Sequence, residues 1–410
     1  MTPAEELAPE PTADAGLPVL RLKRGEDRRL RAGHLWVFSN EVDTEHSPLS
    51  RFSVGQIVAV HTDRDQFLGY AYINPHALIC ARILSRSPVH PPDVSLLVHR
   101  LKVALALRER LYKQPYYRLV FGESDGLPGL VLDRYGDVLV GQIATAGMEA
   151  LRADIEAAVQ QVIAPRALVW KNDGSARELE QLPRQVLTAF GKAPDELQVQ
   201  EGALKYVVAL GQAQKTGWFY DQTSNRELFG RLLTPGARVL DVCSYAGGWA
   251  VSALRHGARE AVCVDSSEGA LASAARNAAA NGVAITARKG DAFEVLDELL
   301  RAGERFDAII LDPPAFIKRR KDAPRGQAAY RKLNQLAMRL LERDALLVSC
   351  SCSWHLPADE LLALIQSAGR HTSRFVQVLA SGGQSPDHPV HPAIPETRYL
   401  KAFFCRVTRE

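Results

Sequence analysis

The chain has 410 residues, and its 50 lysine and arginine residues nearly balance 47 aspartate and glutamate residues, for a formal net charge of +3. This balance identifies no nucleic-acid-binding protein by itself, although it permits a local basic face. No apolar run approaches the roughly 18 residues of a membrane span, and the N-terminus is acidic where a secretion signal would be basic. The six cysteines form no disulfide-like framework. We therefore expect a cytoplasmic protein of two or three domains that contacts no membrane.

The first part of the chain predicts a tail followed by a small β-barrel. Residues 1–17 are rich in Pro, Ala, Glu and Thr without periodicity, which is typical of a disordered tail. Short alternating strands separated by turns follow over residues 18–90. Within them we expect Trp36 and Phe38 to lie in the barrel core. The surrounding basic residues favour RNA contact, and the candidates are Arg24, Arg28, Arg29 and Arg31.

Residues 91–195 predict a small α+β module between the barrel and the C-terminal part. Apolar periodicity indicates a helix, a hairpin, a second helix and a further strand, over residues 94–112, 130–143, 149–162 and 167–170. A dense turn carries Glu123 and Asp125. We interpret this turn as structural and assign its acids no catalytic role.

Residues 196–410 are organised around the stretch 238–250. A short apolar run predicts a buried parallel strand, small residues follow, and a helix begins at about Trp249. A strand, a glycine turn and a helix N-terminus form the nucleotide-binding corner of a doubly wound sheet, because backbone approaches the ligand there. The candidate ligand-binding residues of this corner are Asp241, Ser244, Ala246 and Gly247.

Three further acids follow predicted strands of the same sheet. Asp265 ends the second strand, where a carboxylate can hold both hydroxyls of a ribose. Asp291, followed by Ala292, is placed to accept a hydrogen bond from an adenine amine. Asp312 opens an Asp-Pro-Pro turn, and its two prolines fix a rigid turn at the edge where open α/β sheets bind ligands. Asp312 is therefore a candidate for both cofactor contact and catalysis.

Taken together, these motifs resemble class I S-adenosylmethionine-dependent methyltransferases. A nicotinamide-binding domain would need Gly-x-Gly-x-x-Gly after the first strand, and the chain lacks it there. The resemblance implies a Rossmann-like doubly wound α/β sheet and S-adenosyl-L-methionine as the cofactor. In that family, a run like the one beginning at Lys215 lies against the cofactor. The resemblance therefore makes Tyr220, Gln222 and Arg226 candidates for contacts to the methionine end.

The N-terminal and C-terminal segments narrow the resemblance. Residues 23–42 are similar to the opening of a PUA domain, a pseudobarrel that binds structured RNA. Asp387-His-Pro and Tyr399-Leu-Lys-Ala-Phe resemble the end of bacterial large-subunit ribosomal RNA cytosine-5 methyltransferases that carry such a domain. The resemblance implies 23S ribosomal RNA as the partner, naked or in an assembling large subunit. The oligomeric state stays open, a homodimer included.

Cys352, in a Ser-Cys-Ser sequence just after a predicted strand, resembles the nucleophile of RNA cytosine-5 methyltransferases. Carbon 5 of cytosine is a weak nucleophile, and a thiolate added at carbon 6 activates it. Asp312 would hydrogen-bond the N3 and amino edge of the base. Cys350 would face the same way on an extended strand, but Cys352 lies nearer the carboxyl edge, and a core role is the alternative for a free cysteine. No residue stands out as the base that removes the carbon-5 proton.

Two alternatives remain at this point. A guanine methyltransferase could use the same scaffold, and its chemistry needs no thiol, so Cys352 separates the two reactions. A non-catalytic RNA-binding ribosome-assembly factor would not need the intact acids. The basic run beside the predicted catalytic turn favours RNA contact, through Lys318, Arg319 and Arg320. No Cys and His cluster completes a set of four ligands, so we expect no metal site.

Overall fold

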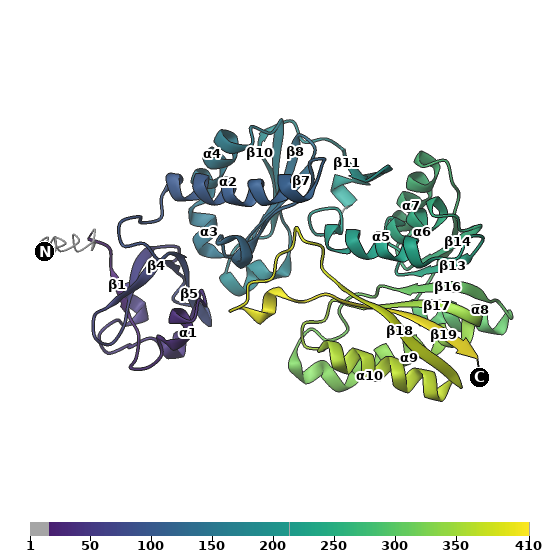
Figure 1. Cartoon of the computed structure of the whole chain (residues 1–410). Coiled ribbons are helices and arrows are strands. Elements are labelled where there is room, and N and C mark those ends of the chain that lie inside the picture. Colours follow the sequence, from purple (N-terminus) through teal and green to yellow (C-terminus); the bar gives the residue numbers. More distant parts are fainter. Residues whose placement is uncertain (1–15, 213, 410) are drawn as a thin grey trace, which may run out of the picture.

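The computed structural model describes residues 16–212 and 214–409, so the predicted tail over residues 1–17 lies almost wholly outside the described residues. These residues form a curled N-terminal sheet, a middle sheet, a short hairpin and a large C-terminal sheet (Figure 1). Among them, no helix is both long and apolar enough to cross a bilayer.

The N-terminal barrel is a five-stranded sheet in the order β1-β3-β4-β5-β2. Its elements are β1 (Val19–Arg21), α1 (Arg28–Arg31), β2 (Trp36–Phe38), β3 (Ile57–His61), β4 (Phe67–Ile73) and β5 (Ile79–Ser85). In β2 it is Val37 that faces the core, with 0% exposure, while Trp36 and Phe38 are only half-buried. Trp36 still packs against the edge of the barrel core, whereas Phe38 does not, so the expectation of a core position is wrong for Phe38, because side chains alternate along a strand.

The middle module is a five-stranded sheet in the order β10-β9-β8-β7-β6, with helices packed against it. Its elements are α2 (Val94–Leu111), β6 (Tyr116–Phe121), β7 (Leu130–Tyr135), β8 (Val138–Ile143), α3 (Ala146–Ala150), α4 (Arg152–Val162), β9 (Ala167–Asn172) and β10 (Gln185–Gly191). The expected hairpin, helices and strand are present. The two outer strands, β6 and β10, have weak sequence patterns and were not predicted.

The C-terminal sheet has seven strands in the order β15-β14-β13-β16-β17-β19-β18. β19 runs opposite to the other six strands, which are parallel to one another, and the inner strands are apolar because both faces of the sheet are packed in apolar clusters. The hairpin β11 (Glu196–Glu201) and β12 (Leu204–Ala209) precedes it. The remaining elements are α5 (Thr223–Leu232), β13 (Arg238–Val242), α6 (Gly248–Arg255), β14 (Glu260–Asp265), α7 (Glu268–Ala280), β15 (Thr286–Lys289), α8 (Ala292–Arg301), β16 (Phe306–Leu311), α9 (Ala323–Leu340), β17 (Leu341–Ser351), α10 (Ala358–His371), β18 (Arg374–Gly383) and β19 (Lys401–Arg409).

The segment between β18 and β19 fastens the three parts together. This segment, drawn in yellow in Figure 1, leaves the C-terminal sheet and reaches toward the barrel. Ile394 in this segment is fully buried within the apolar core of the barrel. The barrel also contacts the middle module, because the Trp36 indole N–H donates to Glu123 Oε1 at 2.9 Å. Glu123 thus joins the barrel to the middle module, and Asp125 of the same turn pairs with Arg108.

Candidate active site

The turn after β13 has a strained backbone. Cys243 and Tyr245 have φ values of 66° and 48°, and Gly247 follows with φ of 78°. Non-glycine residues rarely adopt this left-handed conformation, and such strain concentrates at functional sites. A Cβ atom at Gly247 would also lie 2.9 Å from the Cβ of Ala274, so packing requires glycine there as well.

The predicted acids converge on this turn. Asp241, Asp265 and Asp312 lie at the ends of parallel strands, so they share one edge of the sheet. Burial raises the pKa of the Cys243 thiol, and the negative charges of Asp265, Asp312, Asp241 and Asp291 raise it further. All four carboxylates therefore lie close enough to the Cys243 thiol to raise its pKa.

Asp241 and Ser244 present buried polar atoms without partners. Asp241 Oδ2 accepts a hydrogen bond from the Ala250 N–H at 3.1 Å. Within the described chain, Asp241 Oδ1 and Ser244 Oγ are buried and have no hydrogen-bond partner. Burial, together with the charge of Asp312, raises the pKa of Asp241 to about 8. Since buried polar groups are nearly always paired, these two atoms fit a polar ligand at this corner.

Asp265 and Asp291 already accept backbone hydrogen bonds. Asp265 Oδ2 accepts from the Tyr245 N–H and its Oδ1 from the Ser267 N–H, each at 2.9 Å. Each oxygen keeps a second lone pair for a ligand hydroxyl. Asp291 Oδ1 accepts from the Phe293 N–H at 2.8 Å and caps α8, so this residue has a structural role besides the predicted contact.

Ala246 and Ala292 are less distinctive. The Ala246 side chain is buried in an apolar cluster, and its carbonyl oxygen accepts from the Asn277 side chain at 3.0 Å. Ala292 is the partly buried first residue of α8. Each could offer a ligand only backbone atoms or a methyl surface.

Asp312 is held by two side-chain donors. Its Oδ1 accepts from Gln222 Nε2 at 3.0 Å, and its Oδ2 accepts from the Trp249 indole N–H at 3.1 Å. These bonds favour the charged carboxylate, but burial outweighs them and raises its pKa to about 6. The orientation of Asp312 is therefore fixed before any substrate binds.

A hydroxyl clamp orients Cys352. The Ser351 hydroxyl donates to the Tyr330 hydroxyl at 3.0 Å, and the Ser353 hydroxyl lies 3.0 Å from the same oxygen. Ser351 and Ser353 both contact the Tyr330 hydroxyl, whereas the intervening Cys352 has a different neighbour. Its Sγ lies 3.9 Å from the carbonyl oxygen of Pro313, beside Asp312. Cys350 is fully buried in an apolar cluster.

Two lysines lie near this cysteine. Burial and then the charge of Asp312 raise the pKa of Cys352, whereas Lys215 lowers it. Lys401 Nζ donates to the carbonyl oxygens of Ser353 and Tyr399 at 2.6 and 2.9 Å, and burial lowers its pKa to about 8. Sequence reasoning assigned roles to neither lysine, although both lie in runs that it singled out.

Tyr220 and Arg226, two of the predicted cofactor contacts, bond to other parts of the protein. The buried Tyr220 hydroxyl donates to the carbonyl oxygen of Arg134 at 3.0 Å, in the middle module. Arg226 forms a buried ion pair with Glu201. A buried hydroxyl or guanidinium needs a partner, and these partners come from segments that local sequence patterns do not connect. Of the three candidates in this run, only Gln222 contacts Asp312.

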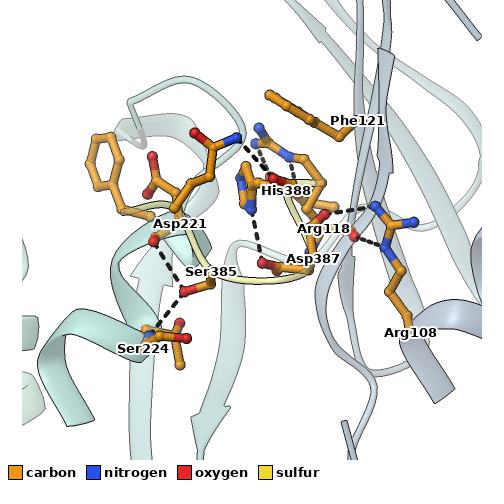
Figure 2. Close-up of polar contacts among 12 residues, drawn as sticks. Arg108, Arg118, Phe121, Asp221, Ser224, Ser385, Asp387 and His388 are labelled. Atoms are coloured by element: carbon orange, nitrogen blue, oxygen red, sulfur yellow. Dashed lines mark hydrogen bonds and ion pairs between the residues drawn. The ribbon is translucent and has the colours of Figure 1, made fainter. Parts of the chain in front are cut away.

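The Asp387-His388 motif ties the active-site edge to the middle module (Figure 2). Arg108 Nη2 donates to the Asp387 carbonyl oxygen at 2.7 Å, and Asp387 Oδ2 accepts from the Arg118 N–H at 2.9 Å. On its other side, the Ser385 hydroxyl donates to the Asp221 carbonyl oxygen at 3.0 Å. Asp221 directly precedes Gln222. This loop therefore holds the segment that orients Asp312.

The predicted RNA-binding residues differ in their surroundings. Arg29 pairs with Glu41 and Arg31 with Asp27, each at 2.5 Å. The basic run after the Asp-Pro-Pro turn is exposed, with one ion pair at 3.6 Å from Arg319 to Asp322. Of the predicted RNA-binding residues, four have no side-chain hydrogen bond or ion pair to another described residue: Arg24, Arg28, Lys318 and Arg320.

Comparisons with known proteins agree with this geometry. A family of S-adenosylmethionine-dependent methyltransferases matches residues 184–404, and a PUA-like domain family matches residues 20–86. The chain is 35% identical over 398 residues to the ribosomal RNA large subunit methyltransferase I of Erwinia tasmaniensis, which covers 95% of this chain and 99% of that protein. It is 34% identical over 396 residues to the protein of the same name from Serratia proteamaculans, with the same coverage of 95% and 99%.

Solved structures share the fold at lower identity. An S-adenosylmethionine-dependent methyltransferase from Streptococcus mutans matches with a TM-score of 0.80 and 22% identity, covering 95% of this chain and 100% of that one. A methyltransferase complexed with SAH matches with a TM-score of 0.81 and 21% identity, covering 95% and 100%. The whole arrangement of barrel, middle module and C-terminal sheet is therefore shared.

Proposed function

Because the chain belongs to the S-adenosylmethionine-dependent methyltransferases, and among them to the ribosomal RNA large subunit methyltransferase I family, we propose that it forms 5-methylcytosine in 23S ribosomal RNA with Cys352 as nucleophile. The chain is thus an enzyme rather than a non-catalytic assembly factor. Nothing in the comparisons supports the homodimer that the sequence left open. The reaction would take place in the cytoplasm, where large subunits assemble.

S-adenosylmethionine supplies an electrophilic methyl group on its sulfonium. We assign its binding to the strained turn after β13 and to the acids around it. The unpaired Asp241 Oδ1 and Ser244 Oγ would meet its polar groups, and Asp265 would accept from its ribose hydroxyls. This assignment rests on buried polar atoms that otherwise stay unsatisfied.

The thiol of Cys352 carries the reaction on the RNA. As a thiolate it would add to carbon 6 of cytosine, and carbon 5 would then attack the methyl group, whose bond to the sulfonium breaks and leaves a neutral thioether. A base takes the carbon-5 proton, the carbon–sulfur bond breaks, and the thiolate is restored. Asp312, held by Gln222 and Trp249, would hydrogen-bond the N3 and amino edge of the ring. Its pKa of about 6 lets it share a proton with N3 near neutral pH.

The observation that carries the proposal is the clamp that turns Cys352 toward Pro313 and Asp312. The test uses ribosomal RNA that contains 5-fluorocytosine. Fluorine cannot leave as a proton does, so the bond from sulfur to carbon 6 should persist as a covalent adduct. Cys352→Ala should abolish both adduct and turnover while cofactor binding continues.

Cys350→Ala is the matched control, because this neighbouring cysteine is buried in the core. It should keep adduct formation and most turnover. A guanine methyltransferase needs no thiol, so wild-type turnover in the Cys352→Ala enzyme would replace our proposal with that alternative. Loss of the adduct in Cys350→Ala alone would move the nucleophile to Cys350.

RNA recognition is assigned to two basic surfaces. The first is the barrel face around α1, where Arg24 and Arg28 would contact phosphates. The second is the exposed run Lys318 to Arg320, beside the Asp-Pro-Pro turn. Contacts of this kind release counterions, so RNA binding should weaken steeply as salt rises.

A further inference from the structure

A cavity of about 820 Å³ opens between the barrel and the segment that precedes β19. We call it the interdomain pocket and define it by Arg29, His34 and Phe38 on the barrel side and by Pro392, Pro395 and Glu396 on the other. It lies outside the turn and the acids assigned to the cofactor.

Both walls of the interdomain pocket are held in place. Ile394, between the two prolines, is fully buried in the barrel core. A Cβ atom on Gly33, the neighbour of the lining residues Ala32 and His34, would lie 3.6 Å from the Cβ of Ala393, so the two walls are in close contact there. The Arg86 guanidinium donates to the His34 carbonyl oxygen at 2.9 Å and steadies the barrel wall. The cavity is therefore formed before any ligand arrives, as binding sites usually are.

Arg29 offers a flat platform in this pocket. Its guanidinium lies 4.8 Å from the centre of the Phe38 ring, and its Nη2 pairs with Glu41 Oε1 at 2.5 Å. Glu41 Oε2 in turn accepts from the Phe38 N–H at 2.8 Å. The Arg29 side chain is still 39% exposed and lines the pocket, so part of it is accessible to a ligand there. RNA-binding proteins stack unpaired bases on such planes.

The charges of the pocket select a base rather than a phosphate. Glu41 neutralises Arg29, and the exposed Glu396 adds a second carboxylate to the wall. A phosphate would be repelled by this pair of acids, whereas a base carries no charge and its amino and imino groups can donate to a carboxylate. The unpaired Arg24 and Arg28 are available for the phosphates at the same barrel face.

The pocket is joined to the catalytic cysteine through Trp354. The indole N–H of Trp354 donates to the Pro395 carbonyl oxygen at 3.3 Å, and 41% of this tryptophan is exposed. Trp354 follows Cys352 by two positions, so their Cα atoms are at most about 7 Å apart. An RNA strand that leaves the pocket past Trp354 therefore reaches the neighbourhood of the thiol.

We propose that the interdomain pocket binds one unstacked base of the RNA substrate, stacked on Arg29, close to the target nucleotide. This inference rests on the proposed function, since it assumes that the strand continues to Cys352. It assigns the segment before β19 a role in substrate recognition, and it makes the RNA site a composite of the barrel and the C-terminal domain.

The test fills the pocket without touching either core. Ala32 lines it and is exposed, so Ala32→Trp should occupy the space of the base. Val54→Trp is the matched control, because Val54 is 49% exposed on the same barrel and does not line the pocket. Binding of a deproteinised 23S ribosomal RNA transcript should weaken about tenfold in Ala32→Trp, as expected for one lost stacking contact, and stay unchanged in Val54→Trp. Equal affinities for the wild-type enzyme and Ala32→Trp would overturn the proposal.

Arg29→Lys separates stacking from charge. Lysine keeps the positive charge but lacks the planar face, so the variant should lose affinity as Arg29→Ala does. Wild-type affinity in Arg29→Lys would mean a phosphate contact and would also overturn the proposal. The adduct of wild-type enzyme with 5-fluorocytosine RNA is read separately. If that adduct is missing while Ala32→Trp still weakens RNA binding, the pocket stands and the proposed reaction fails.

Discussion

Replacing Tyr330 by phenylalanine removes one oxygen and leaves the rest of a buried side chain in place. That oxygen is bonded to the Ser351 and Ser353 hydroxyls, each at 3.0 Å. A net contribution of about 0.5–1.5 kcal/mol for each hydrogen bond predicts a loss of about 1–3 kcal/mol in the free energy of unfolding. Ser353 keeps its bond from the Ile317 N–H at 3.1 Å, so we expect the lower half of this range.

The effect of Tyr330→Phe on activity should exceed its effect on stability. Without the clamp, Cys352 is free to turn away from Pro313, and a misplacement of about 1 Å at a reacting group can cost about a hundredfold in rate. The assays are single-turnover methyl transfer, calorimetric cofactor binding and denaturant unfolding. We expect slower transfer with unchanged cofactor affinity.

The control for this substitution is Tyr116→Phe, because the Tyr116 hydroxyl has no hydrogen bond within residues 16–212 and 214–409. A double-mutant cycle of Tyr330→Phe with Ser351→Ala should show coupling, since the two side chains share a bond. A Tyr330→Phe enzyme with wild-type transfer rate would refute the reasoning. Loss of cofactor binding in that variant would point to wider damage instead.

Three further outcomes follow from the site. Asp265→Ala should weaken S-adenosylmethionine binding by about 1.5–3 kcal/mol while the protein stays folded, and unchanged affinity by calorimetry would contradict its assignment. Folding raises the pKa of Asp241 from 3.8 to about 8, so the stabilisation from its protonated form is complete below pH 3.8 and is lost as pH rises to about 8. The free energy of unfolding should therefore fall between these pH values in the wild-type protein and fall less in Asp241→Asn. Lys215→Gln should move Cys352 alkylation to higher pH, because Lys215 lowers the pKa of this thiol, and an identical pH profile in both proteins would exclude that role.

The sequence by itself determined which acidic residues lie at the carboxyl edge of the C-terminal sheet. Asp241, Asp265 and Asp312 each follow a short apolar run, and parallel strands bring their carboxyl ends to one edge whatever the details of packing. Cys352 is the predicted nucleophile rather than Cys350 because it stands beyond the apolar run, where a strand ends at that same edge. These inferences use only local periodicity and the topology that it implies.

Only the tertiary structure decided which way individual side chains turn and what they meet. Alternation along β2 allows either Val37 or its neighbours to face the barrel core. Packing against distant strands buries Val37, and Phe38 therefore faces the interdomain pocket. Tyr220 bonds to Arg134, and Ile394 enters a barrel core more than three hundred residues away in the chain. Such contacts join segments with no local pattern in common. Their partners are set by how the domains pack, because each buried donor or apolar side chain takes the complementary surface that packing brings to it.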